Sequence, residues 1–133
     1  MRSRGLCLAI IFFLSVVGAF AQAAKPDMAK LVGTWKVDLR PTPDAAEYFQ
    51  EFEVTRIDGK TFTGKFYGTE IKNGRVNFDW GTVWLAFTSE DQSGLYSHFA
   101  KLVGGKLEGG THSLGRDFLL PWRAEKVNQA KNR

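Results

Sequence analysis

Residues able to do chemistry are scarce in this chain. It contains two histidines, His98 and His112, and a single cysteine, Cys7. The hairpin predicted below places the two histidines on opposite faces, and no further ligand stands at a suitable spacing for a metal. Asp79 and Asp117 could act as general bases, but each lies beside a predicted turn, where aspartate is common. We therefore expect no catalytic site, no bound metal and no cofactor, and hence no enzyme.

Two further patterns resemble chemistry without supplying its geometry. Thr111, His112 and Ser113 bring hydroxyls next to an imidazole, but successive residues of a strand point to opposite sides, so no nucleophile and base meet there. The glycine pairs Gly104-Gly105 and Gly109-Gly110 do not follow the pattern of a phosphate loop that opens a helix. They are better explained as hairpin and close-packing glycines.

A polar cluster on one predicted hairpin is the best candidate site. Gly104-Gly105 predicts a two-residue turn that pairs Leu102 with Leu107 and Ala100 with Gly109. The same register places small and polar side chains on one inward face, and two nearby tryptophans could join them. The candidate ligand-binding residues are Tyr96, His98, Thr111, Ser113, Trp80 and Trp84. The alternative is a hydrogen-bond cluster that satisfies itself or binds buried water without a ligand.

Short strands must position these residues. Val, Thr, Phe, Tyr and Trp alternate with polar residues from Gly33 onward, and turn-forming residues interrupt them at regular intervals. The pattern predicts an all-β domain, an eight-stranded antiparallel up-and-down barrel in which each strand pairs with the next. The predicted strands are 33–40, 47–57, 60–68, 75–79, 82–89, 94–103, 106–113 and 117–126.

Two details of this barrel follow from local pattern. A type I turn at Arg56-Ile57-Asp58-Gly59-Lys60, with Gly59 left-handed, predicts that Val54 faces Phe62 and Phe52 faces Gly64. The segment 82–89 does not specify its inward face, because both sets of alternating residues are apolar.

The N-terminus predicts export. Arg2 and Arg4 precede an apolar run that is shorter than the about 20 residues of a membrane-spanning helix, and small residues follow it. We expect residues 1–21 to be a signal peptide, cut after Ala21 or Ala23, with an uncleaved anchor as the alternative. The expected divisions are an N-terminal arm over 22–31, the barrel over 32–127 and a polar tail over 128–133. The mature protein would be periplasmic or extracellular, without stable membrane insertion.

Charge argues against nucleic acid as a partner. The formal charge of the whole chain is +4, and loss of Arg2 and Arg4 with the signal peptide lowers it by two. No cluster of basic residues interleaved with aromatic ones remains to follow a phosphate backbone.

The segment Leu31-Val32-Gly33-Thr34-Trp35 resembles the opening of the first strand in the calycin group, which includes the lipocalins. The resemblance implies that Trp35 closes one end of the barrel and that a basic side chain from the last strand packs across it. Lys126 is in phase with Trp122 and Ala124, so it fits that role better than Arg123 does. The rest of the domain resembles the group in layout only.

Two functions remain open from the sequence. One is a binder or carrier of a small, neutral or aromatic molecule at the barrel mouth. The other is a protein-binding module, similar to the periplasmic protease inhibitors built on small barrels of this type. That function would use residues 22–30 and the proline-containing loop over 40–46.

Overall fold

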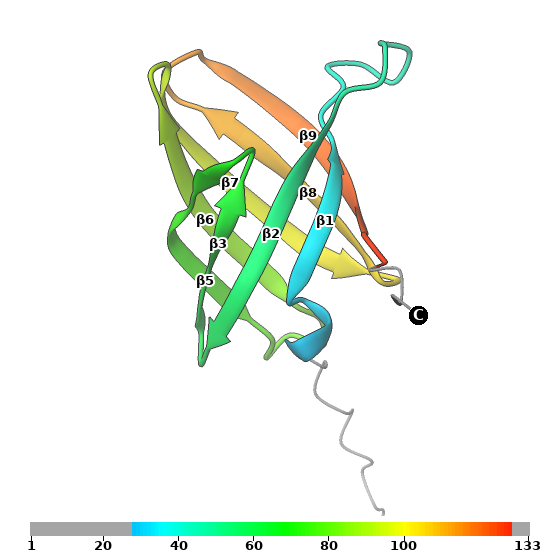
Figure 1. The fold of residues 1–133 in the computed structure, drawn as a ribbon, viewed down its shortest axis with the longest axis vertical. Coiled ribbons are helices and arrows are strands. Elements are labelled where there is room, and N and C mark those ends of the chain that lie inside the picture. Colours follow the sequence, from blue (N-terminus) through cyan, green and yellow to red (C-terminus); the bar gives the residue numbers. More distant parts are fainter. Residues whose placement is uncertain (1–27, 129–133) are drawn as a thin grey trace, which may run out of the picture.

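The computed structural model describes residues 28–128, and these form a single antiparallel β-sheet closed into a barrel (Figure 1). A short 3₁₀ helix, η1 (Met28–Lys30), precedes the sheet. The strands are β1 (Gly33–Asp38), β2 (Phe49–Asp58), β3 (Thr61–Phe66), β4 (Thr69–Glu70), β5 (Lys72–Asn77), β6 (Trp84–Asp91), β7 (Gly94–Val103), β8 (Lys106–Ser113) and β9 (Phe118–Lys126).

The strand order confirms the predicted architecture. The sheet runs β2-β1-β9-β8-β7-β6-β5-β3-β4, and the additional pairing of β2 with β3 closes it. The two-residue strand β4 pairs with β3, as β5 does, and only Ile71 separates it from β5. Counting β4 and β5 as one strand, eight strands form the wall of an up-and-down barrel, consistent with the calycin-like barrel expected. Within residues 28–128 the structure has no helix long and apolar enough to cross a membrane.

Hairpin β7–β8 has the predicted register. Ala100 pairs with Gly109 and Leu102 with Leu107 across the Gly104-Gly105 turn, and both of these glycines have positive φ. His98 pairs with Thr111, and both side chains are buried on the inner face. The pairing holds because a two-residue turn with left-handed backbone matches the twist of the flanking strands.

Hairpin β2–β3 differs from the prediction. Phe52 faces Phe66 and Val54 faces Gly64, so the predicted pairs of Val54 with Phe62 and of Phe52 with Gly64 are wrong. The turn is formed by Gly59 and Lys60, between the paired residues Asp58 and Thr61, and so lies later than expected. A β-bulge after Val54 takes up an additional residue. Phe52, Val54 and Phe62 nevertheless all point inward, as expected. The partners of Phe52 and Val54 moved by two residues, and an even shift keeps side chains on the same face. The bulge takes up the one remaining residue of the shift near the turn.

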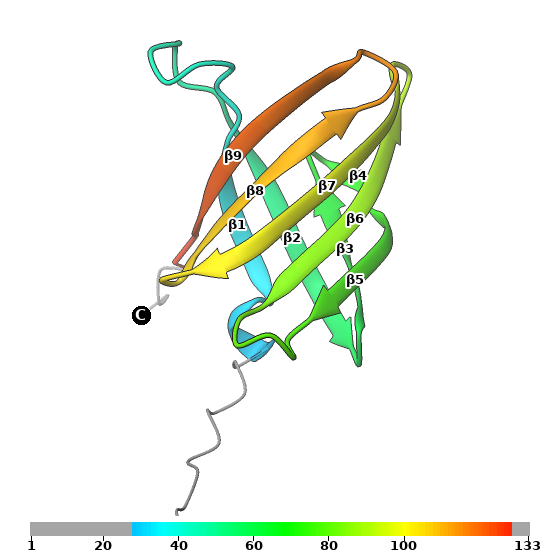
Figure 2. The same cartoon turned by 180° about the vertical axis from the view of Figure 1, so that it is seen from behind.

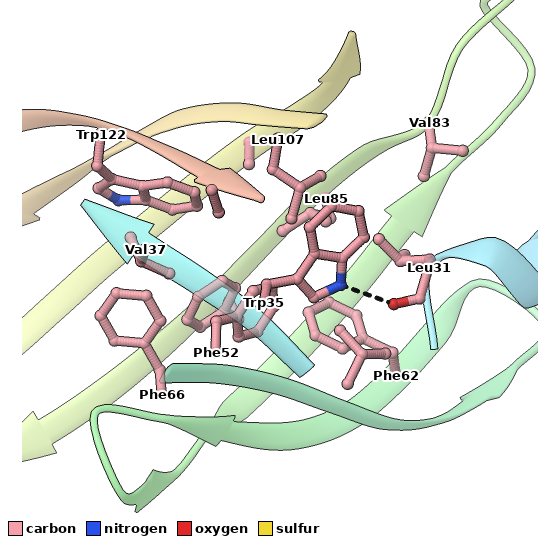
Figure 3. Packing of buried hydrophobic residues seen from close by; sticks show 14 of the residues in the cluster. Leu31, Trp35, Val37, Phe52, Phe62, Phe66, Val83, Leu85, Leu107 and Trp122 are labelled. Carbon is pink, nitrogen blue, oxygen red and sulfur yellow. Dashed lines mark hydrogen bonds between the residues drawn. The ribbon is translucent and has the colours of Figure 1, made fainter. Parts of the chain in front are cut away.

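Aromatic side chains fill most of the interior (Figure 3). The Phe52 ring stacks on Phe87 with centroids 4.9 Å apart, and Phe62 and Phe66 lie against both. Trp122 contacts this cluster through Phe66, with centroids 6.0 Å apart. An eight-stranded barrel is just wide enough for side chains to fill or to hold one small ligand, so little room is left at this level.

One end of the barrel is closed. Trp35 is 1% exposed, and its Nε1 donates to the Leu31 carbonyl oxygen at 2.9 Å (Figure 3). The Lys126 Nζ lies 5.0 Å from the centre of the Trp35 ring and donates to the carbonyls of Lys30 and Val32, at 2.6 Å for Val32. This burial lowers the pKa of Lys126. Arg123, the other basic residue considered, is exposed.

The segment before β1 lies at the closed end. It belongs to the expected N-terminal arm over 22–31, and there Met28 of η1 packs against the core and Leu31 is completely buried. An apolar side chain in a polar segment finds its place in the core because the hydrophobic gain outweighs the cost of ordering it. The expected signal peptide, the rest of the arm and residues 129–133 of the expected tail lie outside the described residues.

Candidate functional site at the open end of the barrel

The end opposite Trp35 is open and holds a pocket of about 240 Å³. Strands β1, β3, β6 and β8 end there, and β2, β5, β7 and β9 begin there, as Figures 1 and 2 show. The pocket residues come from almost every strand and from the connecting loops. They are Leu39, Tyr48, Phe66, Tyr67, Thr69, Ser89, Glu90, Asp91, Tyr96, His98, Thr111, Arg116, Phe118 and Leu120.

A hydrogen-bond chain forms the floor of this pocket. The Nε2 of His98 lies 2.7 Å from Ser89 Oγ, and its Nδ1 lies 2.7 Å from Thr111 Oγ1. The indole Nε1 of Trp122 donates to the same Thr111 oxygen at 2.9 Å. The four side chains therefore form a continuous chain from the core to the pocket, ending at Ser89.

Strand pairing explains why these side chains meet. Ser89 on β6 and Tyr96 on β7 are opposite in the sheet, and His98 on β7 is opposite Thr111 on β8. Leu120 on β9 is opposite Thr111, which places Trp122 one inward position further along β9. Neighbouring strands thus each supply one inward polar group to the chain.

His98 is held as a neutral imidazole. Its side chain is 2% exposed, and its ring packs against Phe66 and Phe87, with centroid distances of 4.4 Å and 4.5 Å. Burial lowers the pKa of His98 from its ordinary 6.5 to about 4. Neither Ser89 nor Thr111 carries a charge that could stabilise an imidazolium.

The contact between Ser89 and His98 has the distances of a nucleophile and a base, but the surroundings oppose proton transfer. An activated serine needs an imidazole that can accept its proton, usually with a carboxylate behind the other nitrogen. Here the group behind Nδ1 is the Thr111 hydroxyl, and the low pKa of His98 makes it a weak base. The arrangement is therefore suited to presenting hydrogen-bonding groups to a bound molecule.

Aromatic side chains surround the mouth above this floor. All three tyrosines of the chain, Tyr48, Tyr67 and Tyr96, line the pocket. The Tyr48 and Tyr67 hydroxyls contact each other, and their rings meet edge to face with centroids 6.2 Å apart. Tyr67 has a φ of 55°, an uncommon backbone conformation for a residue with a bulky side chain.

Charged groups are confined to the rim. Glu90 and Asp91 lie on β6, and Arg116 lies on the turn between β8 and β9, 5.1 Å above the Phe118 ring. Sequence analysis did not identify Ser89, Arg116 or the two outer tyrosines as site residues. Ser89 could have been found only if the inward face of β6 had been known, and the apolar residues on both faces concealed it.

The predicted site residues divide into two groups in the structure. Tyr96, His98 and Thr111 line the pocket. Ser113 is inward and completely buried beside them, but its Oγ accepts a hydrogen bond from the Arg116 backbone N–H at 3.1 Å, so it supports the turn.

Trp80 and Trp84 lie elsewhere, and their placement at the mouth is corrected. Trp80 is 80% exposed, and Trp84 begins β6 at the closed end of the barrel, where Lys101 lies over its ring at 5.3 Å. Strand β6 turns Leu85 and Phe87 inward, which leaves Trp84 facing outward.

The small residues Ala100 and Gly109 do not line the pocket. A side chain at Gly109 would collide with the carbonyl oxygen of Phe99 and with Ala100, and Gly109 pairs with Trp122 on β9. These two positions are small because the wall is tightly packed there. The pocket exists because the strands extend past the aromatic core toward the open end.

The fold and the pocket together define a class of protein: an eight-stranded antiparallel up-and-down barrel with one closed end and one open, aromatic end. No protein-family model, curated protein or solved structure matches the chain. Among residues 28–128, no three His, Cys, Asp or Glu side chains are grouped so that they could hold a metal ion.

Proposed function

We propose that the protein binds or carries a small, neutral, aromatic molecule at the open end of the barrel. The observation that supports this most directly is the convergence of all three tyrosines and the Ser89–His98 pair on one pocket. Ligand sites are typically concave and mostly apolar, with a few polar groups that fix orientation.

The size of the pocket limits the ligand. A cavity of roughly 150 Å³ accepts benzene. The pocket at the open end measures about 240 Å³, so it suits a single ring with a short substituent.

The polarity of the pocket also favours a neutral ligand. Its floor holds a neutral imidazole and two hydroxyls, while the rim carries the carboxylates of Glu90 and Asp91 and the guanidinium of Arg116. An ion buried at the floor would lose its hydration and find no opposite charge. A neutral ring avoids that cost and can pack against the aromatic walls.

Titration of ¹⁵N-labelled protein with benzyl alcohol tests this proposal. We expect saturable amide shifts at the open end, around Ser89 and Tyr96, with none at the closed end around Trp35. The variant Tyr96→Ala removes one aromatic wall and should weaken binding about tenfold, or about 1.4 kcal/mol.

The matched control is Trp84→Ala, which removes an aromatic side chain from the outer surface at the other end. It should leave the affinity unchanged. Shifts spread over the outer surface, or equal losses in both variants, would reject the open end as the binding site. Native mass spectrometry of the purified protein would then identify any molecule that it retains.

A protein-binding module is the second candidate. A groove of about 550 Å³ lies between the β1–β2 loop and the outer side of β8 and β9, and Pro41, Pro43, Pro121 and both Arg40 and Arg123 line it. Arg40 is held rigid by paired hydrogen bonds to Asp38 at 2.9 and 3.0 Å, so the loop is preorganised. Arg123→Glu should abolish binding of a partner at this groove without changing the benzyl alcohol titration.

Export of the protein is also a proposal. It rests on the sequence of residues 1–21, which the described part of the structure does not include. Expression of the full chain followed by N-terminal sequencing of the secreted product should give Gln22 or Ala24 as the first residue. A product that retains Met1 and stays with the membrane would favour the uncleaved anchor instead.

A further inference from the structure

Trp122 lies at one end of the hydrogen-bond chain at the pocket floor, and the direction of its hydrogen bond is fixed. An indole N–H donates and never accepts, so Trp122 always donates to the Thr111 oxygen. Thr111 has one hydrogen of its own to donate and can accept from two groups. His98 is neutral and carries one N–H, on either Nδ1 or Nε2.

The four side chains have four hydrogens for three contacts, so one hydroxyl hydrogen is left over, and the tautomer of His98 decides whether it belongs to Thr111 or to Ser89. If Nδ1 of His98 carries the proton, it donates to Thr111, whose oxygen already accepts from Trp122. The Thr111 hydrogen then has no acceptor, because within residues 28–128 the structure gives this hydroxyl no third partner. A buried donor without a partner costs free energy. Thr111 already has two partners and lies one inward position deeper than Ser89, because Ser89 is opposite Tyr96 whereas Thr111 is opposite His98.

The opposite arrangement leaves the remaining hydrogen on Ser89, at the end of the chain, instead of on Thr111. Thr111 donates to Nδ1 of His98, and the proton on Nε2 is donated to Ser89 Oγ at 2.7 Å. The Ser89 hydroxyl hydrogen is then unused by the chain. Ser89 is 7% exposed, and it lines the pocket.

We infer that Ser89 presents a hydrogen-bond donor to the pocket, and that the ligand is a small aromatic compound with a neutral acceptor oxygen, of the aryl ketone or aryl aldehyde class. This inference rests on the proposed function and names the chemistry of the ligand at that same site. Trp122, Thr111 and His98 act as positioning residues, since they orient the Ser89 hydrogen but do not themselves donate to the ligand.

The surrounding groups favour a planar carbonyl compound over other acceptors. The Tyr96 ring lies nearly parallel to His98, at an interplanar angle of 21° with centroids 6.2 Å apart. An aryl carbonyl is flat, so its ring can pack against these faces while its oxygen points to Ser89. Its uncharged oxygen is also compatible with a floor that lacks a counter-ion.

A pair of isosteric probes tests the inference. Acetophenone carries a carbonyl oxygen, and α-methylstyrene has a CH₂ group in the same place, so the two differ mainly in the acceptor. We expect acetophenone to bind at least tenfold more tightly in an NMR titration. Ser89→Ala should reduce that preference to less than twofold, whereas Ser97→Ala, on the outer face of β7, should retain it.

The tautomer of His98 gives an independent readout on the free protein. ¹⁵N spectra should show a pyrrole-type shift for Nε2 and a pyridine-type shift for Nδ1. The reverse assignment would overturn the inference, because Ser89 would then use its hydrogen on His98. This measurement needs no ligand, and circular dichroism establishes that each variant is folded.

The outcomes separate this inference from the proposed function. If the ketone and the alkene bind equally at the open end, the donor role of Ser89 is wrong and the proposed function stands. If neither probe binds, both are wrong for small aromatic molecules. A ketone preference that survives Ser89→Ala overturns the inference alone, since another group must then donate.

Discussion

His98 shows how one buried side chain can make the stability of the barrel depend on pH. Its pKa falls from 6.5 to about 4 because the ring is removed from water. In the unfolded chain, His98 takes up a proton below pH 6.5, whereas the folded protein resists this until about pH 4. The stability that the neutral His98 contributes to the folded state is therefore fully present above pH 6.5, and it is lost as the pH falls from 6.5 to 4.

The size of this effect can be measured. A shift of this extent corresponds to a loss of about 3 kcal/mol in the free energy of unfolding between pH 7 and pH 4. Denaturant unfolding at several pH values should show it. The control variant His98→Asn keeps every carboxylate of the protein. Its free energy of unfolding should therefore not fall between pH 6.5 and 5. If it falls there as steeply as in the wild type, His98 is not the cause.

Trp35 is the corresponding residue at the closed end. It is almost completely buried, and Leu31, Lys126 and the η1 backbone surround it. Trp35→Ala should lower the free energy of unfolding by about 3–5 kcal/mol, since a large core side chain leaves a cavity.

The control for Trp35 is Trp80→Ala. Trp80 is 80% exposed, and its removal should change the stability by less than about 0.5 kcal/mol. Chemical denaturation of both variants makes the comparison. Similar small losses would mean that Trp35 does not close the barrel.

Hairpins set the inward face of each strand, and close backbone approaches set the register. In β2–β3 the strands come so near at Gly64 that a Cβ there would lie 1.9 Å from the Glu53 carbonyl oxygen. This crowding occurs beside the bulge that follows Val54. The glycine is required because any side chain would force the two strands apart.

Gly64→Ala should therefore destabilise the protein by about 1–3 kcal/mol, in the range of overpacked positions. Lys65→Ala, at the neighbouring exposed position, should have little effect. Thermal or denaturant unfolding of the two variants decides this. A neutral Gly64→Ala would show that the strands can separate there at no cost.

The barrel as a whole has one weak seam. Strands β7 and β8 pair along their full length, but β3 shares the single residue pair Thr61–Arg75 with β5 and two more pairs with β4. Two further backbone hydrogen bonds join the β3 side to β5, from Val76 to Lys60 and from Ile71 to Gly64. A closed barrel opens where the fewest ladder bonds must break.

Hydrogen–deuterium exchange should reveal this seam. Amides of β5 should exchange faster than the paired amides of β7 and β8, with a difference of at least tenfold in protection. Equal protection throughout would show that the barrel opens only by global unfolding. Binding of a ligand at the open end should slow exchange near Ser89 more than at the seam.

Much of this architecture could be predicted from the sequence, because strands and tight turns are encoded locally. Alternating apolar and polar residues specify a half-buried strand, and Gly104-Gly105 specifies a turn whose geometry permits one register. The pairing of His98 with Thr111 followed from these two facts. The inward positions of β2 and β3 also followed, although their exact partners did not.

The bulge, the inward face of β6 and the membership of the site were decided by the tertiary structure, because these features depend on contacts between residues that are distant in sequence. The bulge after Val54 reflects the crowding at Gly64, and the outward placement of Trp84 reflects the competition of two apolar faces for one core. Ser89 became a site residue only when β6 was placed beside His98. Local sequence thus determined the strands and turns, whereas closure of the barrel determined which side chains share the pocket.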